Sequence, residues 1–473
     1  MRMYVAGEWS DGAQQEELRS PYSGEVIDTV PIARTADVDR AIASAVRGAA
    51  HQRRTTGHER EAILRRAGDI ADTRVEELAS TISRETGKAI AEARVEASRA
   101  GDLLRLSGFE GSQLYGDSLP LDASPGARLH RLGFTLRQPC GVVVAITPFN
   151  YPLLLVLHKI APALAAGNAV VLKPARQTPL TALKLVEILL EAGLHPEAIS
   201  CLSGPGGELG DALCRDPRVR KISFTGSTAT GESITRVAGV KKLSLELGAS
   251  CPVAILPDAD IELAAQAVAL TGYVNAGQAC ISVQRVLADR SVVGDFLDAL
   301  VPKVQAIRAG DPASEDTTIG TLISEREARR VEGVLRTGVE TGARLVTGGE
   351  RDGAVVSPAI VADVDPDSPL SQDELFGPAG AVTTVPDVET AVPLANATRY
   401  GLAAGVFTGD VGNAVRFARE VDAGSVHINW TPLWRADLMP YGGLKGSGIG
   451  KEGPRWAVEE MTELKTVVLH GDA

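Results

Sequence analysis

Between residues 140 and 250, short apolar runs alternate with stretches in which apolar residues recur every three or four positions. The short runs predict strands covered on both faces, and the longer stretches predict helices with one apolar face. The expected strands cover 142–146, 169–172, 199–202, 221–224 and 243–247, and the expected helices cover 153–166, 180–192, 207–214 and 228–237. This alternation predicts an α/β fold with a parallel, Rossmann-type sheet that binds ligands at the carboxyl ends of its strands.

The segments on either side extend this picture. Residues 3–10 are expected to form a strand that ends in a turn at Asp11-Gly12, and helices are expected over about 58–84 and 88–109. After residue 247 the same kind of alternation resumes, which predicts a second α/β unit. Its last core strand is expected at 425–429.

Two segments have the alternation of exposed strands. Residues 128–137 alternate polar and apolar side chains after breaks at Pro120, Pro125 and Gly126, and residues 463–469 alternate in the same way. An isolated two-stranded ribbon is barely stable in water, so these strands need further partners. We therefore predict that they pair with each other in an arm that contacts another subunit.

Composition excludes several classes of protein. Among 473 residues, 44% are hydrophobic, 4% are aromatic and 49 are glycine, which suits helices packed closely on sheets. The net charge of −12, without a basic block, argues against a nucleic-acid partner. No apolar run is long enough for a membrane span, and the N-terminus lacks the apolar core of a signal peptide. Five cysteines without metal-ligand spacing predict a reduced, cytoplasmic protein without a metal site.

Glu246 and Cys280 are the candidates for chemistry. Glu246 ends the fifth expected strand, and Cys280 follows the glycine-containing turn Asn275-Ala276-Gly277-Gln278. A cysteine thiolate attacks carbonyl carbon, and a carboxylate can serve as the base for water. A single cysteine is more often a small buried residue than a nucleophile, so the interpretation depends on the motifs around it.

Seven motifs follow in order, four of them at the carboxyl ends of expected strands. They are Thr147-Pro148-Phe149-Asn150, Lys173-Pro174-Ala175-Arg176, Phe224-Thr225-Gly226-Ser227, Glu246-Leu247-Gly248, Gly277-Gln278-Ala279-Cys280, Glu374-Leu375-Phe376-Gly377-Pro378 and the glycine-rich run 440–450. Each motif is weak alone, but the ordered set is specific. It resembles the aldehyde dehydrogenase superfamily over essentially the whole chain.

The resemblance implies oxidation of a small aldehyde to a carboxylic acid with NAD or NADP, by a homodimer or a homotetramer. It implies a cofactor-binding domain, a catalytic domain, an oligomerisation arm and a loop that returns over the active site. In this chain they correspond, in that order, to residues 1–118 with 140–247, 248–430, 119–139 with 455–473, and 431–454.

The resemblance also implies roles for individual residues. Cys280 attacks the aldehyde, the Asn150 amide and the Cys280 N–H hold the oxyanion, and Glu246 activates the water that releases the acid. Lys173 is expected at the adenosine ribose, Ser227 at the pyrophosphate through a helix N-terminus, and Glu374 at the nicotinamide ribose. The cofactor-binding residues expected are Ile146, Thr147, Pro148, Phe149, Lys173, Ala175, Arg176, Gly206, Gly210, Phe224, Thr225, Gly226, Ser227, Leu247, Gly248, Glu374 and Phe376.

Two positions depart from the family's pattern. Many members that prefer NAD carry Glu three residues after the lysine, where this chain has Arg176. A cation there would accept a 2′-phosphate, which favours competence with NADP, unless Arg176 points to solvent as most loop arginines do. Ala249 replaces the usual second glycine after Glu246, which would restrict the movement of that carboxylate.

Three cationic or polar residues are candidates for binding substrate. The chain resembles the branch that handles lactaldehyde, glyceraldehyde 3-phosphate and phosphonoacetaldehyde. Phosphate-handling members often have Arg before the nucleophile, where this chain has Ala279, but Arg105, His158 and Arg435 could bind a small anion. The alternative is that Arg105 and Arg435 form structural ion pairs. We expect a small polar or anionic aldehyde.

Two rival functions stay open from sequence. A CoA-acylating dehydrogenase would pass the thioester to CoA, but members of that type usually lack the deacylating glutamate that Glu246 supplies here. A binding protein of the same fold that has lost catalysis would have a substitution at position 280, 150 or 246, but Cys280, Asn150 and Glu246 are all present.

Overall fold

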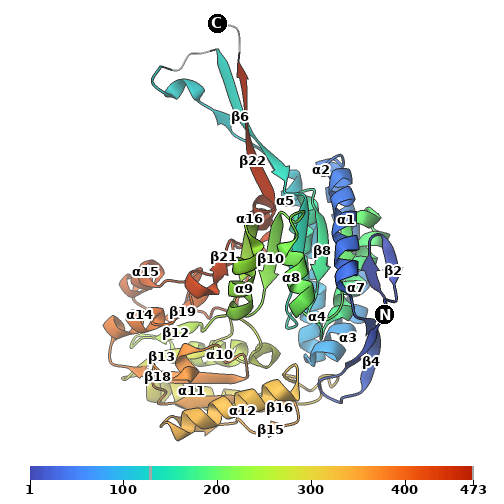
Figure 1. Ribbon diagram of the computed structural model, residues 1–473. Helices are drawn as coiled ribbons and strands as arrows, with labels where there is room; N and C mark the ends of the chain where they lie inside the picture. Colours follow the sequence, from blue (N-terminus) through green and yellow to red (C-terminus); the bar gives the residue numbers. More distant parts are fainter. Residues whose placement is uncertain (127–129, 471–473) are drawn as a thin grey trace.

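The computed structural model describes residues 1–126 and 130–470, as two α/β units and a projecting arm (Figure 1). The first unit is built on an eight-stranded sheet with the order β2-β1-β9-β8-β7-β10-β11-β21. Its strands are β1 (Met3–Val5), β2 (Glu8–Ser10), β7 (Val142–Ile146), β8 (Ala169–Lys173), β9 (Ile199–Cys201), β10 (Lys221–Thr225), β11 (Lys242–Glu246) and β21 (Gly448–Ile449). The central five strands are parallel, which confirms the predicted Rossmann-type alternation.

Helices cover both faces of this sheet because successive strand residues point to opposite sides. Val143 and Ala145 of β7 join one core, whereas Val142 and Val144 join the other. The first core includes α2 (Gly57–Thr73), α5 (Ala100–Ser112), α6 (Leu154–Ala165) and α7 (Pro179–Glu191), and the second includes α1 (Thr35–Gln52), α8 (Gly207–Arg215) and α9 (Thr228–Ala238).

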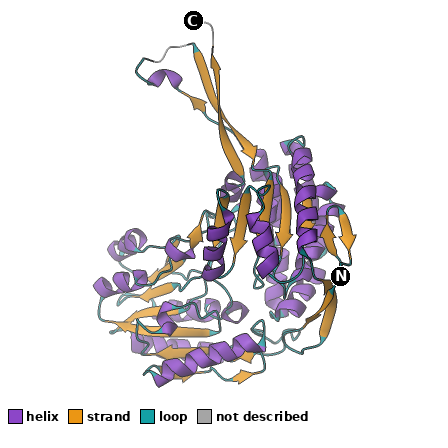
Figure 2. Cartoon of the chain, viewed as in Figure 1, coloured by secondary structure: helices purple, strands orange, loops and turns teal. Residues whose placement is uncertain are grey.

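The second unit has a seven-stranded sheet with helices on both sides, as Figure 2 shows. Its strands, in spatial order, are β14 (Arg344–Thr347), β17 (Ala359–Ala362), β18 (Ala379–Val385), β13 (Arg285–Asp289), β12 (Pro252–Ile255), β19 (Ala403–Phe407) and β20 (Ser425–Ile428). Its main helices are α10 (Ile261–Thr271), α11 (Val293–Gln305), α12 (Glu325–Glu340), α14 (Val388–Asn396) and α15 (Val411–Glu420).

The arm is a three-stranded sheet that stands away from both units (Figure 1). Strand β6 (Arg131–Pro139) pairs antiparallel with β22 (Thr462–His470) and with the short β5 (Ser118–Leu119). The pairing of the tail with the arm, predicted from alternation, is confirmed. Residues 127–129 and 471–473, which we assigned to the arm, lie outside the described residues. The second segment that we assigned to the arm, 455–473, begins within helix α16 (Pro454–Glu460). This helix packs on α5 and α6 instead.

Three local predictions were wrong. Residues 3–10 form a hairpin instead of one strand, because Ala6 and Gly7 take positive φ angles of 56° and 86° and reverse the chain. The expected helix over 58–84 is divided into α2 and α3 (Val75–Thr86), and the expected helix over 88–109 is divided into α4 (Ile90–Ser98) and α5. The second break, at Arg99, places that side chain at the site described below.

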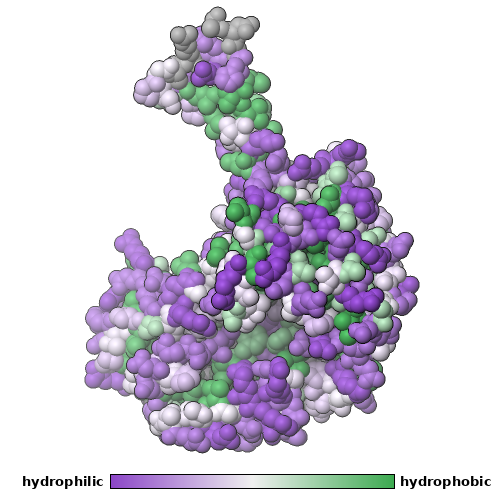
Figure 3. All heavy atoms as spheres, in the orientation of Figure 1, coloured by the Kyte–Doolittle hydropathy of each residue, from purple (hydrophilic) through white to green (hydrophobic). Residues whose placement is uncertain are grey.

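In the described ranges, no helix combines the length and the apolar character that a membrane span requires. The space-filling view in Figure 3 shows a hollow between the two units, with hydrophobic residues visible inside it.

Candidate active site

Two cavities meet at Cys280. The first, which we call the charged pocket, has a volume of about 380 Å³ and is lined by residues of α4, α6 and the segment 433–441. The second, which we call the strand-end groove, has a volume of about 280 Å³ and is lined by residues that follow β7, β10 and β11. Asn150, Leu155 and Cys280 line both cavities. A group bound in one cavity can therefore react with a group bound in the other.

The turn before Cys280 is fixed by its backbone. Asn275, Ala276 and Gly277 all have positive φ, at 52°, 53° and 71°. Gly277 is required, because a Cβ there would lie 2.0 Å from the Gly377 carbonyl oxygen. The Asn275 side chain donates a hydrogen bond to the Asn150 carbonyl at 3.0 Å, so the nucleophile loop is tied to the loop after β7.

Cys280 is a free thiol whose side chain faces Tyr441. Its Sγ lies 2.9 Å from the Tyr441 hydroxyl oxygen. Burial raises the pKa of Cys280 to about 12, and the hydrogen bond with Tyr441 acts in the opposite direction. The thiol is therefore protonated at neutral pH in this arrangement, and groups that stabilise the thiolate decide its reactivity.

Asn150 is buried at the junction of the two cavities. Its Nδ2 donates a hydrogen bond to the Gln278 carbonyl at 2.8 Å, which holds the amide against the nucleophile loop. Its Oδ1 is among the buried side-chain oxygens without a hydrogen-bond partner in the described residues. Asn150 and Cys280 line the same two cavities, which suits a residue whose amide donates to an oxyanion formed there.

Glu246 ends β11 and is 4% exposed. Its Oε2 has no partner among the described residues, and burial, followed by the nearby Glu452, raises the pKa of Glu246 well above its usual range. Glu452 in turn accepts a hydrogen bond from Lys159 at 2.8 Å. A carboxylate with a raised pKa is a stronger base for a water proton than an ordinary one.

The strand-end groove brings together eight of the residues predicted to bind a dinucleotide. They are Pro148, Phe149, Thr225, Gly226, Ser227, Leu247, Glu374 and Phe376. The rings of Phe149 and Phe376 lie edge to face with centroids 5.9 Å apart. Ser227 caps the N-terminus of α9 through the Thr230 N–H, and the buried Thr225 hydroxyl has no partner in the described part of the chain.

The residues of this groove suit the nicotinamide and pyrophosphate part of a dinucleotide. A helix N-terminus presents unpaired N–H groups to a pyrophosphate, and the aromatic rings provide an apolar wall for a flat ring. Glu374 accepts a hydrogen bond from the Ala249 N–H at 3.2 Å, and burial raises the pKa of Glu374 to about 7. A Cβ at Gly248 would lie 2.9 Å from Glu374 Oε2, so the backbone passes close to this carboxylate.

The other predicted cofactor residues lie beyond the groove. Ile146 pairs with Lys173 in adjacent parallel strands, and burial lowers the pKa of Lys173 to about 8. Gly206 precedes α8 directly. The remaining members of this set are Thr147, Ala175, Arg176, Gly210 and Phe224, which follow or belong to β7, β8, α8 and β10.

Arg176 has a partner that sequence did not indicate. Its Nη2 lies 2.6 Å from Glu16 Oε2, and Glu16 belongs to β3 (Gln15–Arg19), which pairs with β4 (Val26–Pro31). The guanidinium that we expected to attract a 2′-phosphate is thus already balanced by a carboxylate. This pair weakens the reason for favouring NADP, because the Glu16 carboxylate would compete with a 2′-phosphate for the guanidinium.

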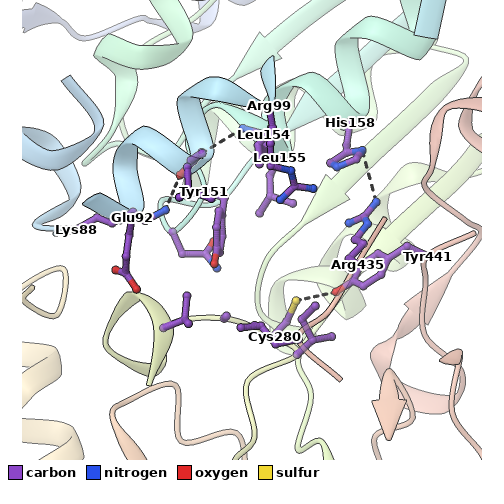
Figure 4. Close-up of a pocket in the computed structure, with 17 residues that line it drawn as sticks. Lys88, Glu92, Arg99, Tyr151, Leu154, Leu155, His158, Cys280, Arg435 and Tyr441 are labelled. Atoms are coloured by element: carbon purple, nitrogen blue, oxygen red, sulfur yellow. Dashed lines mark hydrogen bonds and ion pairs between the residues drawn. The ribbon is translucent and has the colours of Figure 1, made fainter. Parts of the chain in front are cut away.

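The charged pocket brings His158 and Arg435 together and adds Arg99 (Figure 4). Arg435 Nη2 lies 3.5 Å from His158 Nδ1, and its guanidinium stacks over the Tyr441 ring at 3.9 Å. Arg99 pairs with Asp437, which also lies 3.7 Å from His158. Burial and the neighbouring arginines lower the pKa of His158 well below its usual range, so the imidazole is neutral.

The opposite wall of the charged pocket carries an acid. Glu92 accepts a hydrogen bond from the Asn275 N–H at 2.9 Å, and burial raises the pKa of Glu92 to about 7. Lys88 and Glu96 form a fully buried ion pair beside it, and the Lys88 ammonium lies 3.8 Å above the centre of the Tyr151 ring.

The prediction that Arg105 binds substrate is contradicted. Its guanidinium pairs with Asp69, Asp72 and Asp102 at 3.0, 2.6 and 3.1 Å, away from the residues that line the charged pocket. The helix on which we placed it breaks at Arg99, and α5 then packs on α2, which supplies two of these aspartates. Arg105 is thus a structural ion-pair residue, the alternative that the sequence left open.

Several residues that line the cavities were not expected there from the sequence. They are Lys88, Glu92, Arg99, Tyr151, Gln278, Arg330 and Tyr441. Three of them had a usable signal: Tyr151 follows Asn150, Gln278 is in the nucleophile motif, and Tyr441 is the second residue of the glycine-rich run. Arg330 is on α12, far from any motif, and donates a hydrogen bond to the Leu375 carbonyl at 2.6 Å.

Comparison with known proteins gives matches over nearly the whole chain. The model of the aldehyde dehydrogenase family matches residues 9–467. A 3-sulfolactaldehyde dehydrogenase of Priestia aryabhattai is 42% identical over 468 residues, which cover 99% of this chain and 98% of that protein. A lactaldehyde dehydrogenase of Methanococcus vannielii is 36% identical over 472 residues, which cover 99% of this chain and 100% of the relative.

A solved structure extends this similarity to three dimensions. The glyceraldehyde-3-phosphate dehydrogenase GapN of Methanocaldococcus jannaschii, complexed with NADP, superposes with a TM-score of 0.93 at 36% identity. The superposition covers 97% of this chain and 100% of that chain.

Proposed function

Because the chain belongs to the aldehyde dehydrogenase family, we propose that it oxidises a small 2-hydroxyaldehyde with a singly charged anionic group, a sulfonate, at its far end. The family match confirms the resemblance and the type of reaction predicted from the motifs, with NAD or NADP as acceptor. The named relatives act on lactaldehyde, 3-sulfolactaldehyde and glyceraldehyde 3-phosphate, which share a three-carbon 2-hydroxyaldehyde and differ in the group on the third carbon.

The observation that carries this proposal is the convergence of Arg99 and Arg435 in a cavity that ends at Cys280. Arg99 and Arg435 supply two positive charges, and Asp437 supplies one negative charge. Lys88 and Glu96 offset each other, as do Lys159 and Glu452, and Glu92 is neutral below its pKa of about 7. The balance of one positive charge favours a monoanion over a phosphate dianion. Guanidinium groups bind the oxygens of such anions through directed N–H donors.

The reaction begins at the junction of the cavities. The Cys280 thiolate attacks the aldehyde carbon and forms a thiohemiacetal, whose oxyanion is held by the Asn150 amide and the Cys280 N–H. Each such donor contributes about 3 kcal/mol to transition-state stabilisation. Phe149, Phe376 and Glu374 would hold a nicotinamide in the strand-end groove, where it would supply the acceptor for the hydride. Loss of that hydride from the thiohemiacetal leaves a thioester on Cys280.

Glu246 completes the cycle as the base for water. The glycine-rich run closes over it, because a Cβ at Gly442 would lie 2.7 Å from Glu246 Oε1. Its unpaired Oε2 and raised pKa suit a group that takes a proton from the water that attacks the thioester. This carboxylate supports hydrolysis over transfer of the acyl group to CoA.

The arm supports a homodimer or a homotetramer. Strands β6 and β22 expose large apolar side chains that water alone does not stabilise. They include Leu132, Leu136, Leu464 and Leu469, each 48–58% exposed. The change Leu136→Glu is expected to lower the mass of the particle in light scattering, and an unchanged mass would remove the arm from the interface. A reduced, cytoplasmic setting stays a prediction, which the five free thiols support.

The substrate proposal is tested by following reduced nicotinamide with a set of aldehydes. We expect kcat/KM for 3-sulfolactaldehyde to exceed that for lactaldehyde by about a hundredfold, the range of a charge-assisted hydrogen-bond pair. Glyceraldehyde 3-phosphate is expected between them, and succinic semialdehyde tests whether a carboxylate serves as well. Equal values for the neutral and anionic substrates would refute the proposal, and activity only with CoA present would favour the acylating rival.

A further inference from the structure

Tyr441 contacts the proposed nucleophile and the cation of the charged pocket with one side chain. Its hydroxyl lies 2.9 Å from Cys280 Sγ, and the Arg435 guanidinium lies 3.9 Å above the centre of its ring (Figure 4). The next residue, Gly442, packs against Glu246. Tyr441 is 9% exposed, so water does not compete freely for its hydroxyl.

The direction of this hydrogen bond follows from the chemistry of the thiol. In the resting protein either atom can donate, but a thiolate carries no proton and can only accept. In the described structure, Tyr441 is the one side chain that hydrogen-bonds to Cys280 Sγ. In the reactive state, therefore, the phenol is the donor that stabilises the thiolate charge in a buried site.

Arg435 reinforces this donor. A guanidinium stacked on an aromatic face holds the ring in place, and its positive charge favours withdrawal of electrons from the phenol. Both effects make the hydroxyl a stronger and better-directed donor toward sulfur. The position of Arg435 therefore serves Cys280 as well as the anionic group of the substrate.

We propose that Tyr441 is a positioning residue that holds Cys280 and stabilises its thiolate through the phenol hydroxyl. The proposal deepens the function given above and rests on Cys280 as the nucleophile. It assigns no proton transfer to Tyr441, which keeps its proton throughout. The same hydrogen bond holds the sulfur at the junction of the two cavities before the aldehyde arrives.

The test measures the reactivity of the thiol directly, without aldehyde or cofactor. The rate of alkylation by iodoacetamide is followed against pH in the wild type and in Tyr441→Phe, which removes only the hydroxyl. We expect alkylation of Cys280 to be about tenfold slower in the variant at about pH 8, because one hydrogen bond to a charged group is lost. A Cys280→Ser protein gives the background from the other four cysteines.

Two further proteins make the result specific. Tyr273→Phe is the matched control, because Tyr273 is also a buried phenol, with its hydroxyl 3.0 Å from the Ala359 carbonyl oxygen. It is expected to alkylate at the wild-type rate. A fluorinated tyrosine at position 441 keeps the shape and is a stronger donor, so it is expected to alkylate faster than the wild type.

The proposal is overturned if Tyr441→Phe and the fluorinated protein both alkylate at the wild-type rate. If Tyr441→Phe does not fold, the fluorinated protein decides alone. Failure of the function proposed above looks different: the aldehydes would not be oxidised, while the alkylation rates would still respond to position 441.

Discussion

The two cavities that meet at Cys280 are built in opposite ways. The strand-end groove is lined mainly by short motifs that follow β7, β10 and β11, and its shape depends on backbone, glycine and two aromatic rings. The charged pocket is lined by side chains from α4, α6 and the segment 433–441, and its character depends on ion pairs between them. A groove of the first kind suits a ligand common to a family, whereas a pocket of the second kind can change its ligand by a few substitutions.

The largest effect is expected at Glu246, which acts in hydrolysis of the thioester, after the ligands of both cavities have reacted. Glu246→Gln keeps the shape of the side chain but removes the base, so the first turnover should give one equivalent of reduced nicotinamide and the steady rate should fall by about a thousandfold. Rapid mixing followed by steady-state measurement separates these phases. A wild-type steady rate would exclude Glu246 as the base.

Arg435→Lys is expected to affect the charged pocket and, through Tyr441, Cys280, but not the binding of the cofactor in the strand-end groove. The lysine keeps the charge but loses the planar donors and the stacking on Tyr441, so kcat/KM for an anionic aldehyde should fall by about tenfold. Binding of NAD, measured by calorimetry, should not change. A loss of NAD affinity as large as the loss of kcat/KM would show that the two cavities are not separate.

The pH dependence of kcat/KM offers a further test of the charged pocket, through the side chain of Glu92. With a pKa of about 7, this side chain is neutral in acid and becomes a carboxylate in the charged pocket as the pH rises. The Glu96 carboxylate raises the pKa of Glu92, as burial does, and the Lys88 ammonium lowers it. We expect kcat/KM for an anionic aldehyde to fall severalfold as pH rises through about 7, because like charges repel. Glu92→Gln should remove this fall, and neutral lactaldehyde should not show it.

The smallest effect is expected at Glu16 and Arg176, near the adenosine end of the cofactor site. Because the Arg176 side chain is more than half exposed, although Glu16 is mostly buried, the pair is worth little energy, and changes of about threefold in the NAD to NADP ratio are expected. Glu16→Gln frees the arginine and should shift the ratio toward NADP, whereas Arg176→Glu should shift it toward NAD. If neither ratio moves, the pair does not face the ribose.

The contrast between the cavities also explains what could be predicted from sequence. The carboxyl ends of parallel strands meet at one edge, so Asn150, Thr225 and Glu246 could be placed together from strand order alone. The other residues that follow these strands in the strand-end groove could be predicted for the same reason. The pairing of β6 with β22 could be predicted because alternation marks both strands.

The charged pocket could not be predicted in the same way, because it depends on one break in a helix. Apolar spacing over 88–109 is continuous, and the residue at the break, Arg99, is not itself a helix breaker, although Gly101 lies two residues beyond it. We placed Arg105 on a helix over 88–109, but that helix is divided at Arg99, and Arg105 on α5 pairs with aspartates of α2 and α5 instead. The contact between Arg99 and Asp437 joins positions 338 residues apart, and no local pattern encodes it.

The most direct test of the account is the selectivity between 3-sulfolactaldehyde and lactaldehyde in the wild type, Arg99→Gln and Arg105→Gln. Arg99 lines the charged pocket and Arg105 is paired on the surface, so the two changes are matched in chemistry and differ in position. We predict that Arg99→Gln lowers the ratio of kcat/KM values by about tenfold or more and that Arg105→Gln leaves it unchanged. Equal ratios in all three proteins would contradict the assignment of the charged pocket as the anion site.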